Sequence, residues 1–366
     1  MKCSLNGNAA VSATSNLGNE RKAWIDFAKF IGLYFVLLSH AEVNIPLLSG
    51  LGNLFYICIF FVLAGYTYHD QDMTCASFAK KKAIRILIPY FSYSFLLFIL
   101  VMLKNIVMGT FQMKEAGRAI FGILYARNYL LHPADATTEP FMTILNAPMW
   151  FLPAYFVSFL LFHRLVRWGR ERLVAAIFIS LTIGVVIHYF CPILLPWSID
   201  TAFIFAGMFG VGYLASYAEQ NYSLVRREDF QYLFLVGIFI IMLILQFYNG
   251  SMNLSIGHFG KTVYGGFLGA ICGSLFIMIT SKKLPAKIPA LTVAIGQNSL
   301  VIMAFHLFFF ELIRMAFQSF GSGLWSASSP EAKLIRGILA LLTMLVITQI
   351  KLIYDKIRTG NGVKNS

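Results

Sequence analysis

Ten apolar stretches of about twenty residues each, separated by short polar segments, run through almost the whole chain. A helix needs about 20 mostly apolar residues to cross a bilayer. Charged residues make up only 12% of the chain, whereas soluble domains carry roughly 25%. The sequence therefore predicts an all-α integral membrane protein with about ten transmembrane helices, at about 24–42, 52–69, 86–104, 144–163, 173–190, 199–217, 230–248, 262–281, 291–312 and 334–354.

Lys and Arg are distributed unequally between alternate loops. Nineteen fall on the side that holds both chain ends and eight on the other. Cytoplasmic loops are enriched in Lys and Arg, so both termini of this multi-pass membrane protein are expected in the cytoplasm. The net charge of +13 is explained by these loops, and no soluble basic face with interleaved aromatics suggests a nucleic-acid partner.

The chain reads as one membrane domain with two short tails. Residues 1–20 are polar and rich in Ser, Asn and Gly, which predicts a disordered cytoplasmic tail before a domain at 21–356 and a second tail at 357–366. In the long loop at about 105–143, residues 119–131 are too short to span and suit an interfacial or re-entrant helix on the outer side. The five cysteines have no paired spacing, and no metal site is indicated.

The first apolar stretch carries three ionisable residues. Asp26 and Lys29 lie near its cytoplasmic end, and His40 follows eleven residues after Lys29. Eleven helical residues span about 16 Å and close to three turns, which places Lys29 and His40 on one face. Ionisable groups inside a membrane helix are costly and by default indicate function. The structural alternatives are an i,i+3 ion pair at the interface and a packing histidine.

A second histidine lies in the outer half of the ninth span. His306 matches the expected depth of His40. Further polar or aromatic groups are expected at the same outer level, and these candidates for binding the acceptor or supporting the site are Asn146, Trp150, Asp200 and Glu42. Structural alternatives stay open for them: an interfacial anchor for Trp150 and a helix N-cap for Asp200.

A basic segment precedes the third span. Lys82 and Arg85 are i,i+3 neighbours, so they share a helix face from which they can bind the phosphates of a nucleotide-bearing donor. The alternative is topological anchoring by positive charge. The sequence has no Gly-rich phosphate loop followed by Lys-Ser or Lys-Thr, and no Gly-x-Ser-x-Gly turn.

Several short motifs follow one another in a fixed order. After Asp26, Lys29 and His40 comes a Phe-rich second span that ends in a small residue, Gly and Tyr. A Phe, a basic-x-x-Arg element and Pro-Tyr come next, then Trp-Phe-Leu, and finally Gly-x-Asn-Ser-Leu with a downstream histidine. The residues concerned are Phe60–Tyr66, Phe78, Lys82, Arg85, Pro89, Tyr90, Trp150–Leu152, Gly296–Leu300 and His306.

In the order and spacing of these motifs, the chain resembles membrane acyltransferase family 3, and within it the group like fucose 4-O-acetylase, over about 20–355. It departs from the family's pattern at Lys82, where Arg is usual, and at Ala64, where Ser is commoner. The resemblance implies transfer of an acetyl group from cytoplasmic acetyl-CoA to a hydroxyl of a cell-surface carbohydrate or its lipid-linked precursor. Acetyl-CoA is then a substrate, and no bound cofactor is expected.

A mechanism follows as a hypothesis. His40 acts as the base that deprotonates the attacking hydroxyl, or carries the acetyl group covalently. Lys29, oriented by Asp26, and the pair Lys82 and Arg85 hold the donor. A proton-coupled transporter and a polysaccharide exporter remain alternatives, although no repeated halves are apparent. The sequence does not indicate the acceptor sugar, the acyl group, the side of the membrane on which transfer occurs or the oligomeric state.

Overall fold

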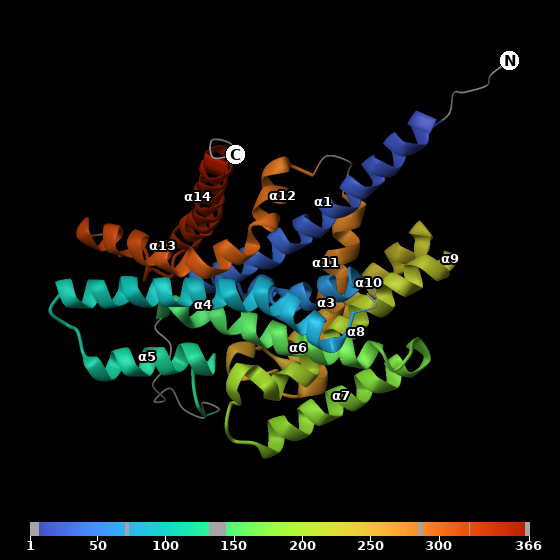
Figure 1. Ribbon diagram of the computed structural model, residues 1–366, viewed down its shortest axis with the longest axis horizontal. Helices are drawn as coiled ribbons and strands as arrows, with labels where there is room; N and C mark the ends of the chain where they lie inside the picture. The colour runs from blue at the N-terminus through green and yellow to red at the C-terminus, as the bar shows by residue number, and fades with distance from the viewer. Residues whose placement is uncertain (1–6, 70–72, 132–143, 285–287, 322, 363–366) are drawn as a thin grey trace.

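The computed structural model describes residues 7–69, 73–131, 144–284, 288–321 and 323–362. Within them the chain forms helices joined by turns, and its only β-type contacts are two isolated bridges (Figure 1). The elements are α1 Gly7–His40, α2 Pro46–Phe55, α3 Cys58–Tyr66, α4 Cys75–Val107, α5 Met113–Tyr125, η1 Ile144–Trp150, α6 Phe151–Val166, α7 Arg170–Phe190, η2 Pro196–Ser198, α8 Ile199–Asn221, α9 Ser223–Arg226, α10 Glu228–Asn249, η3 Leu254–Ile256, α11 Val263–Lys283, α12 Ala290–Gln297, α13 Ser299–Ser319 and α14 Pro330–Gly362.

Nine of the described helical segments are long and apolar enough to cross a membrane. Two shorter helices, α2 and α3, meet at a bend of 41° and make a tenth span when the pair is counted as one. The prediction of an all-α protein with about ten membrane helices is confirmed. The ninth predicted span, 291–312, differs in form, because the helix breaks at Asn298 into the short α12 and the long α13.

Two other predicted segments have different limits in the structure. α1 begins at Gly7, inside the segment expected to be a tail, although its apolar portion is Ala23–His40. α4 begins at Cys75, so the basic segment before the third span is helical and continuous with it.

α5 is the helix expected between spans three and four. It lies beside α4 (Figure 1), where the Tyr90 hydroxyl donates to the Ile123 carbonyl oxygen at 2.6 Å.

The core is built around α8, which packs against α3, α6 and α7. Helices in a membrane associate through close packing of small residues. At Gly65 of α3 a Cβ atom would lie 1.9 Å from the Phe209 carbonyl oxygen of α8, so only glycine permits this approach. Aromatic rings fill the adjacent space, with Phe61 stacked on Phe205 at 4.5 Å and Phe159 on Phe209 at 4.7 Å between centroids.

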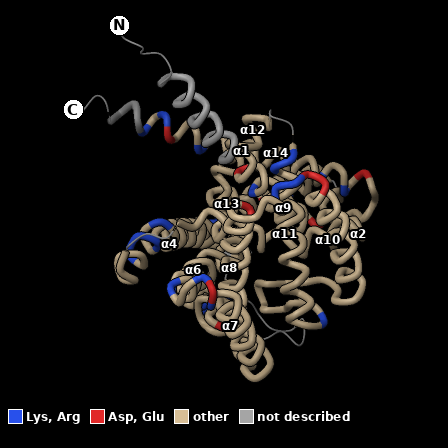
Figure 2. Tube along the Cα trace, turned by 90° about the vertical axis from the view of Figure 1, so that its right-hand side faces the viewer, with Lys and Arg blue, Asp and Glu red and all other residues tan. Residues whose placement is uncertain are grey.

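The outer surfaces of several helices expose large apolar side chains. On α10 these include Leu233, Ile240, Ile244 and Phe247. Such residues are costly in water and suit contact with lipid tails. Lys and Arg gather instead at the ends of helices, and Figure 2 shows them on one face at α4, at the α6–α7 turn and near α9. The charged face and the apolar sides together define a membrane-embedded body.

Candidate active site

The ionisable residues at the start of the apolar part of α1 form an ion pair. Lys29 Nζ lies 2.8 Å from Asp26 Oδ1, and the Asp26 side chain is nearly buried. α12 crosses α1 at this point, and a Cβ atom at Gly296 would lie 1.9 Å from the Asp26 carbonyl oxygen. The Gly-x-Asn-Ser-Leu element therefore packs directly on the backbone of α1, which fixes the position of the pair.

A cavity of about 440 Å³ opens beside this ion pair. Its walls come from α1, α3, α4, α6 and α13, and they are mostly apolar around a few polar groups. Its lining includes Asp26, Lys29, Phe60, Ala64, Thr67, Phe151, Tyr155, Ser299 and Met303. Ligand sites are typically concave, apolar and equipped with a few convergent polar groups. The first and ninth predicted spans thus share the walls of one cavity, although neither His40 nor His306 is among the residues that line it.

The two histidines predicted at equal depth lie in contact. The His40 and His306 ring centroids are 5.1 Å apart with the rings tilted by 46°. His306 is fully buried, and its Nδ1 lies 2.9 Å from the Met303 carbonyl oxygen. Because a carbonyl only accepts, Nδ1 carries the hydrogen and Nε2 is left with a free lone pair. Nε2 has no hydrogen-bond partner among the described residues, whereas His40 is solvent-accessible.

A smaller cavity of about 290 Å³ carries the basic segment of α4. Lys81, Lys82 and Arg85 line it together with tyrosine, histidine and phenylalanine side chains. It shares Ala64, Thr67 and Tyr155 with the larger cavity, so the two adjoin.

The two predicted donor-binding residues are placed differently in this smaller cavity. Lys82 Nζ lies 3.9 Å from the Phe159 ring centroid, a cation–π contact. Arg85 is exposed at the cavity wall. A guanidinium so placed is available to bind phosphate in two-point fashion, whereas the Lys82 ammonium is already engaged with the ring.

The predicted outer residues occupy different environments. Trp150 is buried and packs against Phe205 and Phe151, so it supports the wall of the site through packing and is not an interfacial anchor. Asn146 lies in η1, and its side chain lies outside the described residues. Glu42 lies two residues beyond the end of α1, and its carboxylate is 67% exposed.

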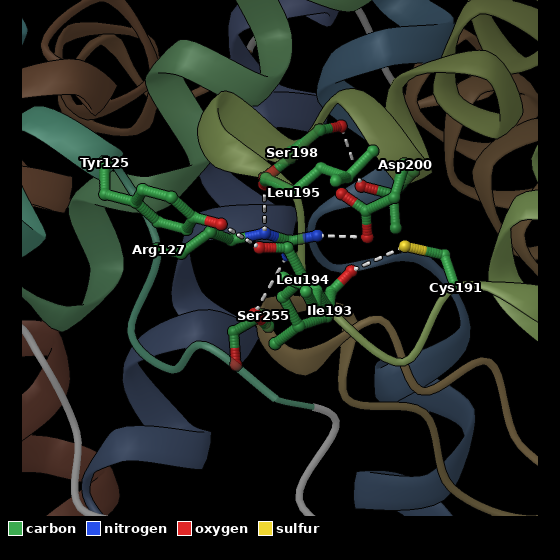
Figure 3. A network of polar contacts seen from close by, with 10 residues as sticks. Tyr125, Arg127, Cys191, Ile193, Leu194, Leu195, Ser198, Asp200 and Ser255 are labelled. Atoms are coloured by element: carbon green, nitrogen blue, oxygen red, sulfur yellow. Dashed lines mark hydrogen bonds and ion pairs between the residues drawn. The ribbon is translucent and has the colours of Figure 1, made fainter.

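Asp200 forms a buried ion pair with Arg127 (Figure 3). The Arg127 guanidinium also donates to the carbonyl oxygens of Leu195 and Ser255, at 3.3 and 3.2 Å. Burial lowers the pKa of Arg127, and the Asp200 carboxylate acts in the opposite direction by favouring the charged form. This network joins the segment after α5 to the start of α8 and to the loop before α11. Asp200 therefore holds these three segments together and is not among the residues that line the cavity.

A second ion pair was not anticipated from the sequence. Lys282 of α11 pairs with Glu219 of α8, and its Nζ lies 4.8 Å from the Trp24 ring centroid. From the sequence, Lys282 and Arg127 contribute only to the positive charge of the loops, and no ion pair is predicted for either. The sequence does contain a signal for such pairs. Acidic residues are scarce in its apolar segments, and each carboxylate buried there needs a cationic partner.

No group of three or more His, Cys, Asp or Glu side chains within the described ranges has a geometry that could hold a metal ion.

Comparison with known families agrees with this arrangement. A family model described as an acyltransferase domain matches residues 22–351. The chain belongs to the acyltransferase 3 family. The match covers α1 through most of α14, so both histidines, the ion pair and both cavities lie inside the acyltransferase domain. No curated protein and no solved structure matches the chain.

Proposed function

We propose that this membrane acyltransferase moves an acetyl group from cytoplasmic acetyl-CoA to a hydroxyl of a cell-surface carbohydrate or its lipid-linked precursor. The main support for the proposal is the position of the His40–His306 pair. These two histidines lie on α1 and α13, and both helices also line the cavity beside Lys29. The basic cavity adjoins it. The two adjoining cavities offer cations for a phosphorylated donor, and α1 carries the His40 imidazole about 16 Å beyond Lys29 for proton transfer.

The donor is proposed to enter from the basic face. Figure 2 shows that face, with Lys and Arg at the ends of α4 and α6 and near α9. Enrichment in Lys and Arg is the mark of a cytoplasmic surface, which would place both chain termini in the cytoplasm of a bacterial cell. Arg85 and Lys81 then bind the phosphates of coenzyme A, and the thioester arm extends into the mostly apolar cavity beside Lys29.

His40 is proposed as the general base. Its neutral imidazole accepts the proton of the acceptor hydroxyl while the hydroxyl oxygen attacks the thioester carbonyl carbon. The carbon–sulfur bond then breaks, and the imidazolium returns its proton to the departing thiolate, so one ester and one thiol are formed. The buried His306 holds a fixed tautomer through its Nδ1 bond and presents Nε2 as an acceptor for a proton near His40.

A covalent route remains a second form of the same proposal. In it His40 receives the acetyl group from the thioester and passes it to the acceptor hydroxyl. The exposure of His40 at the end of α1 suits contact with a separate acceptor. A rapid-quench measurement with radiolabelled acetyl-CoA and no acceptor distinguishes the routes, because only the covalent route gives labelled protein.

The test of the proposed function is acetyl transfer by purified protein in lipid nanodiscs. Radiolabelled acetyl-CoA is supplied with envelope glycan of the source cell from which mild alkali has removed the esters. Wild type and His258→Ala, which changes a histidine in the loop before α11, should label the glycan, and His40→Ala should not. Equal labelling by His40→Ala sinks the catalytic assignment, and proton-driven flux without acetyl-CoA binding would support the transporter instead.

A further inference from the structure

The end of α1 is closed by an unusual residue. The Val43 N–H donates to the Leu38 carbonyl oxygen and the Glu42 N–H to that of Ser39, the paired bonds of a Schellman motif. The residue that this motif requires in the left-handed region is usually glycine, yet here it is Glu42, with φ of 55°. A side chain kept at a position that favours glycine points to a role for the side chain.

The Glu42 carboxylate faces a groove of about 450 Å³. The groove lies between the end of α1, α2 and the start of the loop after α10. Its polar lining comprises Ser39, Glu42, Asn44, Ser49, Asn53 and Ser251, and its apolar lining includes Phe35, Leu38 and Leu48. Hydroxyls and amides beside an aromatic ring match a sugar, which has hydrogen-bonding edges and an apolar face.

Most of these polar side chains are available to a ligand. Ser49 is occupied, because its Oγ accepts from the Ile45 N–H and donates to the Val43 carbonyl oxygen. In contrast, the side chains of Ser39, Asn44, Asn53 and Ser251 make no hydrogen bond to any residue in the described part of the chain. Glu42 is oriented by the buried Arg336, whose Nη1 lies 3.8 Å from its carboxylate.

The groove meets the candidate active site where α1 stops. His40 turns toward His306 on α13, whereas Phe35, Leu38 and Ser39 line the groove on the other side of the helix. His40 is the last residue of α1, so no further helical turn separates the two sides. Ser39 and Glu42 line the groove and lie within two residues of His40 in the chain, so the groove begins close to that histidine.

We infer that this groove is an acceptor subsite for the sugar units that adjoin the acetylated one, so that its residues set how strongly transfer depends on the length of the acceptor. The inference rests on the proposed function and deepens it. Glu42 and the free amides bind hydroxyl groups, and Phe35 offers a ring to the apolar face of a sugar.

The experiment measures how transfer depends on acceptor length. The probes are de-esterified envelope glycan cut to one and to three repeat units and freed of lipid. Wild type is expected to show kcat/KM about tenfold higher for the three-unit probe, because a few added hydrogen bonds correspond to about that factor. Asn53→Leu and Glu42→Gly should bring this ratio toward one. Asn105→Leu, a change of the same type at the far end of α4, should keep it.

Glu42→Gly separates binding from folding. Glycine suits the left-handed position, so the thermal unfolding temperature of the Glu42→Gly variant should equal or exceed that of wild type. The preference for the longer acceptor should be lost. A wild-type ratio near one overturns the subsite, as does a full ratio in both groove variants. A length preference that appears only on lipid-linked probes also overturns it. If no glycan is labelled at all, the result instead contradicts the proposed function itself.

Discussion

The His40 and His306 rings lie 5.1 Å apart, although they come from the first and the ninth predicted spans. Only His306 is buried, and its Nδ1 is committed to backbone carbonyl oxygens. The two imidazoles are therefore not equivalent: one is fixed and the other is accessible.

Because the two histidines differ in burial, their substitution should lower kcat to different extents. His40→Ala should lower kcat by about 10²–10⁴-fold, the usual contribution of a general base. His306→Gln should lower it less, because an amide replaces the imidazole beside His40 without removing the base. The pH dependence of kcat should also shift in His306→Gln, since the neighbour of His40 has changed. Equal losses in both variants with an unshifted pH profile would contradict these roles.

Arg85 and Lys82, two of the three cations that line the basic cavity, should differ in their effect on the donor. Arg85 is exposed at the wall, so Arg85→Ala should raise KM for acetyl-CoA by roughly 10–100-fold, as expected when a hydrogen bond to a charged group is lost. Lys82 is engaged with Phe159, so Lys82→Met, which keeps the apolar stem, should raise it less. Steady-state kinetics at saturating acceptor measure both. A larger effect at Lys82 would show that the ammonium leaves the ring to bind the donor.

The buried Arg127–Asp200 pair should be important for folding. Asp200→Ala leaves an unpaired buried guanidinium, at a cost of about 3–5 kcal/mol. The double variant Arg127→Met with Asp200→Leu should recover much of that loss. Unfolding temperatures in detergent at one fixed scan rate rank the variants.

The matched control for that pair is Asp229→Ala. It breaks the exposed ion pair between Arg227 and Asp229 and should leave the unfolding temperature nearly unchanged. If Asp200→Ala unfolds at the temperature of this control, the outer network contributes nothing measurable to stability.

Gly296 offers a steric test of the contact between α12 and α1. Gly296→Ala places a methyl group 1.9 Å from the Asp26 carbonyl oxygen, so the helices must separate. Overpacking of this kind typically costs about 1–3 kcal/mol or more, and the ion pair beside the cavity should move with it. Gly237→Ala on α10, where a Cβ atom meets no atom within 4 Å, is the control. Equal unfolding temperatures and equal activity in the two variants would contradict the close contact.

The sequence allowed the number and depth of the spans to be predicted, because bilayer thickness and helical rise fix both. The equal depth of His40 and His306 followed from these quantities. Their lateral contact did not, because it depends on how α1 and α13 pack. The break at Asn298 was not predicted, because residues 291–312 are apolar enough overall to be read as one span. The division falls at the polar run Gln297, Asn298 and Ser299, beside the tight contact of Gly296 with α1.

Pairing of charges was the least predictable feature. Asp200 was expected to face the acceptor, yet the structure places it against Arg127, a residue that appeared only as an outer-loop charge. Glu42 follows His40 in the sequence, but its left-handed backbone depends on the turn that closes α1 and was not predicted. Such partnerships depend on loops that approach from distant parts of the chain, which no local pattern encodes.

α1 is a single uninterrupted helix from the ion pair at Asp26 and Lys29 to His40. A continuous helix rotates and shifts as one rod, because each turn is hydrogen-bonded to the next. Any displacement at Lys29 is therefore transmitted over about 16 Å to His40 with the same rotation. In the proposed mechanism, donor binding in the cavity beside Lys29 and placement of the His40 imidazole are therefore one mechanical event, which needs no separate moving domain.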